Sequence, residues 1–187
     1  MRIVGGRMKG LALASVGKGD PARALRPTSD RVRESLFNLL AHGGFGDPVP
    51  GAVVLDVFAG TGALGLEALS RGALHATFIE DGRVALGLLA GNISKARAGA
   101  DCRVIRRSAL KPGPASGDAA SLVFLDPPYG KGLGEKALAA LAEGGWIAPG
   151  ALVVWEERGP QAAPDGFRLL ETRSYGETAI TILEAAG

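Results

Sequence analysis

Hydrophobic and polar positions follow two periods along the central part of the chain. Short apolar runs alternate with longer stretches in which apolar residues recur every three or four positions. The first pattern is typical of buried strands and the second of amphipathic helices, so their alternation predicts an α/β fold with a doubly wound, mostly parallel sheet. The expected strands are 53–57, 76–80, 102–107, 121–126 and 151–157, and the expected helices are 62–71, 83–97 and 133–143.

The two ends of the chain differ from this alternation. Residues 167–175 and 177–183 have extended patterns with only Gly176 between them, which predicts a C-terminal antiparallel hairpin. Residues 1–16 alternate loosely around glycines, so a short N-terminal β-hairpin is expected there.

A helix is expected between that hairpin and the core. Apolar residues recur at helical spacing over 28–42, with Thr28 as the expected N-cap and Asp30 in the first turn. We therefore expect a basic hairpin arm over residues 1–25 and one domain over residues 26–187, in which the α/β core begins at residue 51.

A glycine-rich turn follows the first strand of this core. Gly60, Gly62 and Gly65 have the spacing of a dinucleotide-binding loop, which by itself also fits NAD. Asp56, however, precedes the glycines, and a carboxylate there would repel a pyrophosphate and attract a cation. The combination favours S-adenosylmethionine, which carries an ammonium group.

Polar residues also end the neighbouring strands. Glu80 and Asp126 each follow an apolar run, and Ser108 follows the strand expected over 102–107. Ligands of doubly wound sheets bind beyond the carboxyl ends of the strands, so one crevice can collect these residues with Asp56. A carboxylate such as that of Glu80 suits the two hydroxyls of a ribose.

The sequence Asp126-Pro127-Pro128-Tyr129 is the strongest indication of chemistry. Proline fixes its own φ and restrains the residue before it, so Asp126 and Pro127 are held extended and the Pro127 carbonyl is free to accept. Tyr129 adds a flat stacking surface. A carboxylate, a free carbonyl and a ring together fit a planar amine.

These motifs resemble those of the bacterial 16S ribosomal RNA guanine-N2 methyltransferases of the small ribosomal subunit, which are class I S-adenosylmethionine-dependent methyltransferases. The resemblance covers nearly the whole chain, and its two N-terminal stretches are the most specific to the family. The matching stretches are Arg2 to Gly6 with Gly10, Leu25 to Thr28, Asp30 to Glu34, Asp56 to Arg71, Glu80, Asp126 to Tyr129, and Tyr175 to Thr178.

The resemblance implies methyl transfer to the exocyclic N2 amine of a guanine in 16S rRNA, in assembled small subunits and without a metal. Asp126 and the Pro127 carbonyl would orient the amine and stabilise its developing charge, and Tyr129 would stack on a base that is unpaired or flipped. Ser108 stands where many relatives carry an acid that contacts adenine. The implied cofactor-binding residues are Asp56, Phe58, Ala59, Gly60, Thr61, Gly62, Glu80, Ser108 and Ala109.

Positive charge is concentrated near the start of the chain. The formal net charge is +2, but residues 1–34 hold eight Lys or Arg and only three acids. Cations beside glycine-rich backbone suit phosphates, so 16S rRNA or the small subunit is the expected partner. The expected nucleic-acid-binding residues are Arg2, Arg7, Lys9, Arg26, Arg31 and Arg33.

Composition agrees with one cytoplasmic domain. With 187 residues, 47% of them hydrophobic, the chain can bury a core without disulfides or a metal. Its single cysteine, Cys102, is expected to be a buried thiol. No apolar run reaches about 18 residues and there is no signal-peptide layout, so neither membrane insertion nor secretion is expected. No obligate protein partner is expected either.

Three other functions fit part of the sequence. A methylase of adenine N6 or cytosine N4, on DNA or another RNA, would use the same Asp-Pro-Pro-Tyr motif, although DNA methylases usually need a separate recognition domain. An NAD-dependent oxidoreductase fits the glycine spacing but leaves Asp56 and the Pro-Pro-Tyr unexplained. A non-catalytic ribosome-assembly binder would not require both motifs to be intact.

Overall fold

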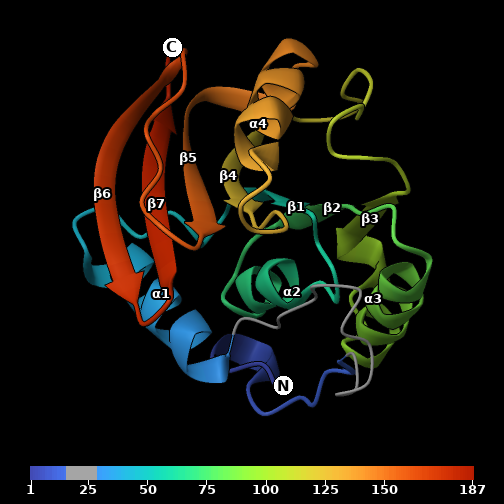
Figure 1. Ribbon diagram of the computed structural model, residues 1–187. Coiled ribbons are helices and arrows are strands. Elements are labelled where there is room, and N and C mark those ends of the chain that lie inside the picture. The colour runs from blue at the N-terminus through green and yellow to red at the C-terminus, as the bar shows by residue number, and fades with distance from the viewer. Residues whose placement is uncertain (16–28) are drawn as a thin grey trace.

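A seven-stranded sheet forms the centre of the protein in a computed structural model that describes residues 1–15 and 29–187 (Figure 1). The strand order is β3-β2-β1-β4-β5-β7-β6, and the first five strands are parallel while β7 is antiparallel to both of its neighbours. The strands are β1 Val53–Val57, β2 His75–Ile79, β3 Cys102–Ile105, β4 Ala120–Leu125, β5 Ile147–Glu157, β6 Phe167–Tyr175 and β7 Thr178–Ala185.

Helices cover both faces of the sheet unequally. In Figure 1, α1, α2 and α3 lie on one side of the strands and α4 lies on the other. Alternate strand residues separate two hydrophobic clusters, so that Val54 packs on the α1–α3 side and Leu55 on the α4 side. The helices are η1 Gly6–Met8, α1 Asp30–His42, α2 Ala63–Ser70, α3 Arg83–Lys95, η2 Gly99–Asp101 and α4 Leu133–Glu143.

The doubly wound sheet and the C-terminal hairpin are confirmed, with shifts of a few residues at element ends. The largest shift is in β5, which begins at Ile147 instead of residue 151. Ala120 pairs with Ile147 and Leu122 with Leu152, so the extra residues of β5 form a bulge that the apolar pattern does not reveal.

The N-terminal segment, residues 1–15, forms a shorter and less regular β-hairpin than expected. Arg2 and Ala12 form an antiparallel bridge, and the short helix η1 lies between them. Backbone N–H groups of Ile3, Gly10 and Leu13 also donate across the segment, to the carbonyls of Leu11 (3.0 Å), Ile3 (2.9 Å) and Met1 (3.0 Å). Ile3 is fully buried, so this segment is packed on the domain and is not a free arm.

Side chains of α2 and α3 hold this hairpin against the domain. The N–H groups of Val4, Met8 and Ala14 donate to Glu67 (2.9 Å), Ser70 (2.8 Å) and Asn92 (2.8 Å) respectively. The contact is so close that a Cβ on Gly6 would lie 1.9 Å from the Ser70 carbonyl oxygen, and Gly6 has φ +72°. A glycine is therefore required there.

Helix α1 begins one residue later than the Thr28 cap would require. Ser29 is the N-cap, and its hydroxyl accepts from the Val32 N–H at 3.2 Å. Thr28 and Arg26 lie outside the described residues. Asp30 is in the first turn as predicted, where it suits the helix dipole. Across the described ranges, no helix has the length and apolar character needed to cross a membrane.

Candidate active site

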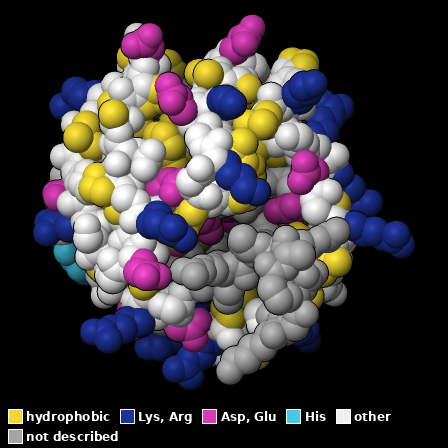
Figure 2. All heavy atoms as spheres, viewed as in Figure 1, with side chains coloured by type: hydrophobic (Ala, Val, Ile, Leu, Met, Phe, Trp, Pro, Cys, Tyr) yellow, Lys and Arg dark blue, Asp and Glu magenta, His cyan; other side chains and the backbone are white. Residues whose placement is uncertain are grey.

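The carboxyl edge of the parallel strands brings the predicted residues together. Asp56 lies in β1, and Asp126 follows the adjacent strand β4, where its N–H donates to the Val57 carbonyl (3.3 Å). Strand order reverses between these two strands, which is where such sheets bind ligands. Figure 2 shows acidic side chains recessed near the middle of one face, with Lys and Arg side chains around them.

The glycine-rich turn has unusual backbone angles. Gly60 and Gly62 have φ of 56° and 78°, and Phe58 also has a positive φ, 58°, which is uncommon for a residue with a side chain. A Cβ on Gly62 would lie 2.4 Å from Leu89 Cδ1, so α3 packs directly beneath the turn. The turn is therefore held in place by the packing of α3 against it.

Asp56 is buried beneath this turn. It is 2% exposed, and its Oδ2 accepts the Gly65 N–H at 2.9 Å. Burial raises the pKa of Asp56 to about 8; the Gly65 hydrogen bond opposes this rise and the charge of Glu80 adds to it. Such a carboxyl group gains most from a cation brought beside it.

Glu80 joins the glycine turn to the start of α3. Its Oε2 accepts the Gly60 N–H (2.8 Å), and its Oε1 accepts the N–H groups of Asp81 (3.0 Å) and Gly82 (2.7 Å). The carboxylate is thus fixed next to the turn, where hydroxyl groups could replace backbone donors. The other predicted cofactor residues offer less: the Ser108 hydroxyl accepts the Leu110 N–H (3.3 Å), and Ala109 is buried.

The Asp-Pro-Pro-Tyr motif forms a rim beside these acids. The pKa of Asp126 is raised well above its ordinary value, first by burial and then by the charges of Glu156, Asp56 and Glu157. Pro127 is buried, and the Tyr129 hydroxyl donates to Glu156 Oε1 at 2.7 Å and lies 3.3 Å from Thr178 Oγ1. A group of carboxyl groups with raised pKa values at one edge indicates a site for a cationic ligand.

Comparisons with known proteins agree with this arrangement. The family model described as "Conserved hypothetical protein 95" matches residues 1–184. "Ribosomal RNA small subunit methyltransferase D" of Escherichia coli (strain K12) is 38% identical over 187 residues, covering 98% of this chain and 89% of that protein. The chain belongs to the ribosomal RNA small subunit methyltransferase D family.

Solved structures extend this result to the fold. "Putative methyltransferase yhhF from Escherichia coli" has a TM-score of 0.81 and 37% identity, covering 100% of this chain and 98% of that one. The "RNA methyltransferase from Salinibacter ruber in complex with S-Adenosyl-L-homocysteine" has a TM-score of 0.64 over 86% of this chain and 94% of that one, but at 18% identity it shows only a shared fold. The expected class I methyltransferase fold is confirmed.

Sequence reasoning missed three residues of this candidate site. Glu156 and Thr178 contact the Tyr129 hydroxyl, and Glu157 accepts the N–H groups of Gly130 (2.9 Å) and Arg158 (2.7 Å). The rule that identified Glu80 and Asp126 also applies to Glu156 and Glu157, because they end the apolar strand β5.

The predicted nucleic-acid-binding residues do not all face solvent. Arg33 is fully buried: its guanidinium donates to Asp30 Oδ1 (2.8 Å) and to the Arg2 carbonyl, and its Nε is 3.6 Å from Glu67. A phosphate cannot reach it, so the prediction for Arg33 is wrong. The hydrophobic spacing of α1 did not reveal that Arg33 would be buried beside an acid of α2, Glu67.

Four other predicted cations, Arg2, Arg7, Lys9 and Arg31, are more accessible. Arg2 and Arg7 are exposed and lie 3.6 Å and 3.5 Å from Asp30 and Asp101. Lys9 and Arg31 are exposed, and within the described part of the chain neither side chain forms an ion pair.

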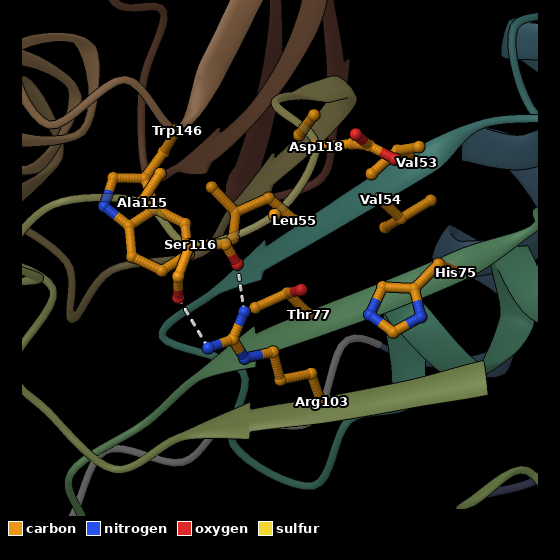
Figure 3. Close-up of a pocket in the computed structure, with 12 residues that line it drawn as sticks. Val53, Val54, Leu55, His75, Thr77, Arg103, Ala115, Ser116, Asp118 and Trp146 are labelled. Carbon is orange, nitrogen blue, oxygen red and sulfur yellow. Dashed lines mark hydrogen bonds between the residues drawn. The ribbon is translucent and has the colours of Figure 1, made fainter. Parts of the chain in front are cut away.

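A hollow of about 250 Å³ lies away from this edge, toward the amino ends of the strands (Figure 3). Its wall includes Arg103, whose guanidinium donates to the backbone oxygen and hydroxyl of Ser116, together with Trp146 and His75. The hollow contains none of the predicted site residues. The hollow lies beside the β3–β4 connection. This connection, between Ile105 and Ala120, contains no helix.

Cys102 is the chain's single thiol, and it is half-buried. Burial, with a smaller effect of the Asp101 charge, raises its pKa to about 12. The thiol is therefore protonated and unreactive at neutral pH. Within residues 1–15 and 29–187, no three His, Cys, Asp or Glu side chains are grouped so that they could hold a metal ion.

Proposed function

We propose that this protein transfers a methyl group from S-adenosylmethionine to the N2 amine of a guanine in 16S rRNA, with assembled small ribosomal subunits as the substrate. The observation that carries the proposal is the pair of raised-pKa carboxyl groups, Asp56 and Asp126, on adjacent strands beside the glycine turn and the Asp-Pro-Pro-Tyr rim. Membership of the methyltransferase family supports the reaction class.

The donor set fits this cofactor. S-adenosylmethionine supplies an electrophilic methyl group on a cationic sulfur. Asp56 and Asp126 would ionise when such a cation is bound beside them, which lowers their raised pKa values, and Glu80 beside the Gly60 to Gly62 turn would supply the ribose acceptor. NAD, with its pyrophosphate, would place anions against these carboxyl groups and is expected not to bind.

Asp126 and the Pro127 carbonyl orient the amine for attack. The lone pair of guanine N2 is delocalised into the ring, so the amine becomes nucleophilic when its N–H bonds are held out of the ring plane. A carboxylate is too weak a base to deprotonate the neutral amine first. It stabilises the positive charge that grows on nitrogen as the N–C bond forms and the C–S bond breaks, and the proton leaves afterwards.

Tyr129 provides the surface on which the guanine stacks. The bond from its hydroxyl to Glu156 fixes the ring relative to Asp126, because both carboxyl groups lie on the α1–α3 side of the sheet. A base inside a helical stack cannot reach this rim, so the target guanine is unpaired or flipped.

Residues 1–25 are proposed as the part that meets RNA phosphates, continuous with the domain of residues 26–187. Arg2, Arg7 and Lys9 are exposed on the N-terminal segment. That segment is fixed to α2 and α3, and a fixed set of cations would place the RNA in a defined register.

The deciding experiment is methyl transfer from labelled S-adenosylmethionine to unmodified small subunits, to free 16S rRNA and to double-stranded DNA. The expected label is on N2 of one guanine, with faster transfer to subunits than to free RNA. Label on adenine N6 or cytosine N4 would instead support the alternative amine methylase, and binding of subunits without transfer would support an assembly factor.

A further inference from the structure

A groove next to the Tyr129 rim has no part in the reaction described above. Its volume is about 460 Å³. One wall is the first half of α1, with Arg31, Val32 and Ser35, and the other is the β6–β7 turn, with Tyr175 and Gly176. Figure 1 shows this turn lying against α1.

The groove and the rim share one face of the sheet. Tyr175 pairs directly with Thr178 in the antiparallel ladder, so the two side chains point to the same side. The Thr178 hydroxyl is 3.3 Å from the Tyr129 hydroxyl. Thr178 therefore connects Tyr129 and Tyr175, which are the only two tyrosines of the chain.

The lining of the groove suits a nucleotide. Arg31 is exposed and its guanidinium has no hydrogen bond or ion pair within the described ranges, whereas Arg2 and Arg33 both pair with Asp30. A Cβ built on Gly176, which has φ +64°, would meet open space, so the backbone of the turn is accessible. A free guanidinium, a ring and open backbone can receive a phosphate and a base.

We propose that this groove binds the nucleotide adjacent to the target guanine in the RNA chain, with its base on the Tyr175 ring and its phosphate on Arg31. The inference rests on the proposed function. A guanine removed from its stack leaves its neighbour without a stacking partner. The Tyr175 ring, which Thr178 separates from Tyr129, takes the place of that partner.

The competing role for Tyr175 is packing, because part of its ring contacts the core on the α1–α3 side. Two substitutions separate the roles. Tyr175→Phe keeps the ring and the packing, and Tyr175→Leu keeps an apolar side chain but removes the stacking surface. Lys136→Ala, an exposed cation on α4 at the other face, is the matched control for Arg31→Ala.

The probe is a single-stranded RNA nonamer with one central guanine and a fluorescent 2-aminopurine directly on its 5′ or its 3′ side. The wild-type protein should quench the fluorophore at one of these positions. Tyr175→Phe should keep the quenching, whereas Tyr175→Leu should lose it and bind about five- to twenty-fold more weakly, as expected for one lost base stack.

Arg31→Ala should keep the quenching and lower the slope of log affinity against log salt by about 0.7, the value for one phosphate contact on a single strand. Lys136→Ala should leave both quantities unchanged. Cofactor affinity, measured by calorimetry, should stay at the wild-type value in all four variants and so report an intact domain.

Quenching in Tyr175→Leu equal to that of the wild type, or no quenching at either flank by the wild type, would overturn the inference. Methyl transfer to subunits distinguishes this failure from a failure of the proposed function. If the wild type methylates guanine N2 and Tyr175→Leu has the same KM for subunits, only the groove inference is wrong. If the wild type methylates no guanine, the function itself is wrong.

Discussion

Three acids of the candidate site accept hydrogen bonds from uncharged backbone N–H groups. Asp56 accepts a backbone N–H from α2, Glu80 accepts three from loops, and Glu157 accepts two. None of these donors brings a positive charge, so a cationic ligand, or positive charge that develops during a reaction, would favour the ionised form of these carboxyl groups.

Asp126→Asn tests this charge at the reacting amine. The amide keeps the size and one acceptor but not the charge, so kcat for methylation of subunits should fall by about 10²–10³-fold, with little change in cofactor affinity. Single-turnover kinetics measure the effect. Full turnover in this variant would show that Asp126 is a structural acid at the end of β4.

Tyr129→Phe separates the ring from its hydroxyl. Stacking needs only the ring, but the hydroxyl donates to Glu156, which is 5% exposed. Removing a donor from a buried carboxylate costs about 1–3 kcal/mol, so this variant should unfold at lower denaturant concentration than the wild type while it still binds RNA. Unchanged stability would mean that Glu156 finds another donor.

The raised pKa of Asp56 predicts how stability depends on pH. The unfolded chain loses this proton near pH 4, whereas the folded protein keeps it until about pH 8, so stability falls as pH rises through this window. Asp56→Asn should therefore show a smaller drop in Tm between pH 6 and 8.5 than the wild type. Asp126 contributes in the same direction, so some of the drop should remain; identical drops would contradict the assignment.

At the level of elements, the sequence predicted those whose hydrogen bonds are local or follow from apolar periodicity. The strands, α2 to α4 and the C-terminal hairpin are of this kind. The N-terminal segment is so only in part, because its backbone also bonds to Glu67, Ser70 and Asn92, which are more than 60 positions away. No periodicity within residues 1–16 contains that information.

Helix α1 shows the same limit for single side chains. The pairing of Arg33 with Asp30 is visible as a spacing of three residues, but its second acid, Glu67, comes from α2. Asn92 is a similar case: it is fully buried and bridges Ala14 to the Thr61 carbonyl of the glycine turn (2.9 Å). Arg33 and Asn92 therefore fix where the N-terminal segment lies relative to the glycine turn.

The exposed and the buried cations of these elements should behave differently. Replacing Arg2, Arg7 and Lys9 together by alanine should weaken binding of RNA or subunits and lower its salt slope by up to about 0.7 to 0.9 per lost contact, with unchanged cofactor affinity.

Arg33→Ala should instead destabilise the fold by about 3–5 kcal/mol, because it leaves buried Glu67 without this partner. Chemical denaturation measures this loss of stability.

Filter binding at several salt concentrations measures the effect of the triple alanine variant. Equal salt slopes for the wild type and the triple variant would remove the N-terminal segment from the RNA interface.

In the whole molecule, the N-terminal segment and the C-terminal strand β7 both reach the same edge of the sheet. The N-terminal segment reaches the glycine turn through Asn92, and β7 reaches the Tyr129 rim through Thr178. The hollow of Figure 3 lies toward the opposite edge, where no predicted residue is found. The proposed binding and chemistry are therefore both on the side that the carboxyl ends of the parallel strands define.

The position of β7 between β5 and β6 has a consequence for the order of events during synthesis. β6 is made first, yet its only strand partner is β7, so it stays unpaired until the following strand has left the ribosome. Thr178 arrives with that same strand. A nascent chain thus lacks a complete rim, and the protein gains its proposed ability to modify ribosomal subunits only after β7 has been made and has paired with β5 and β6.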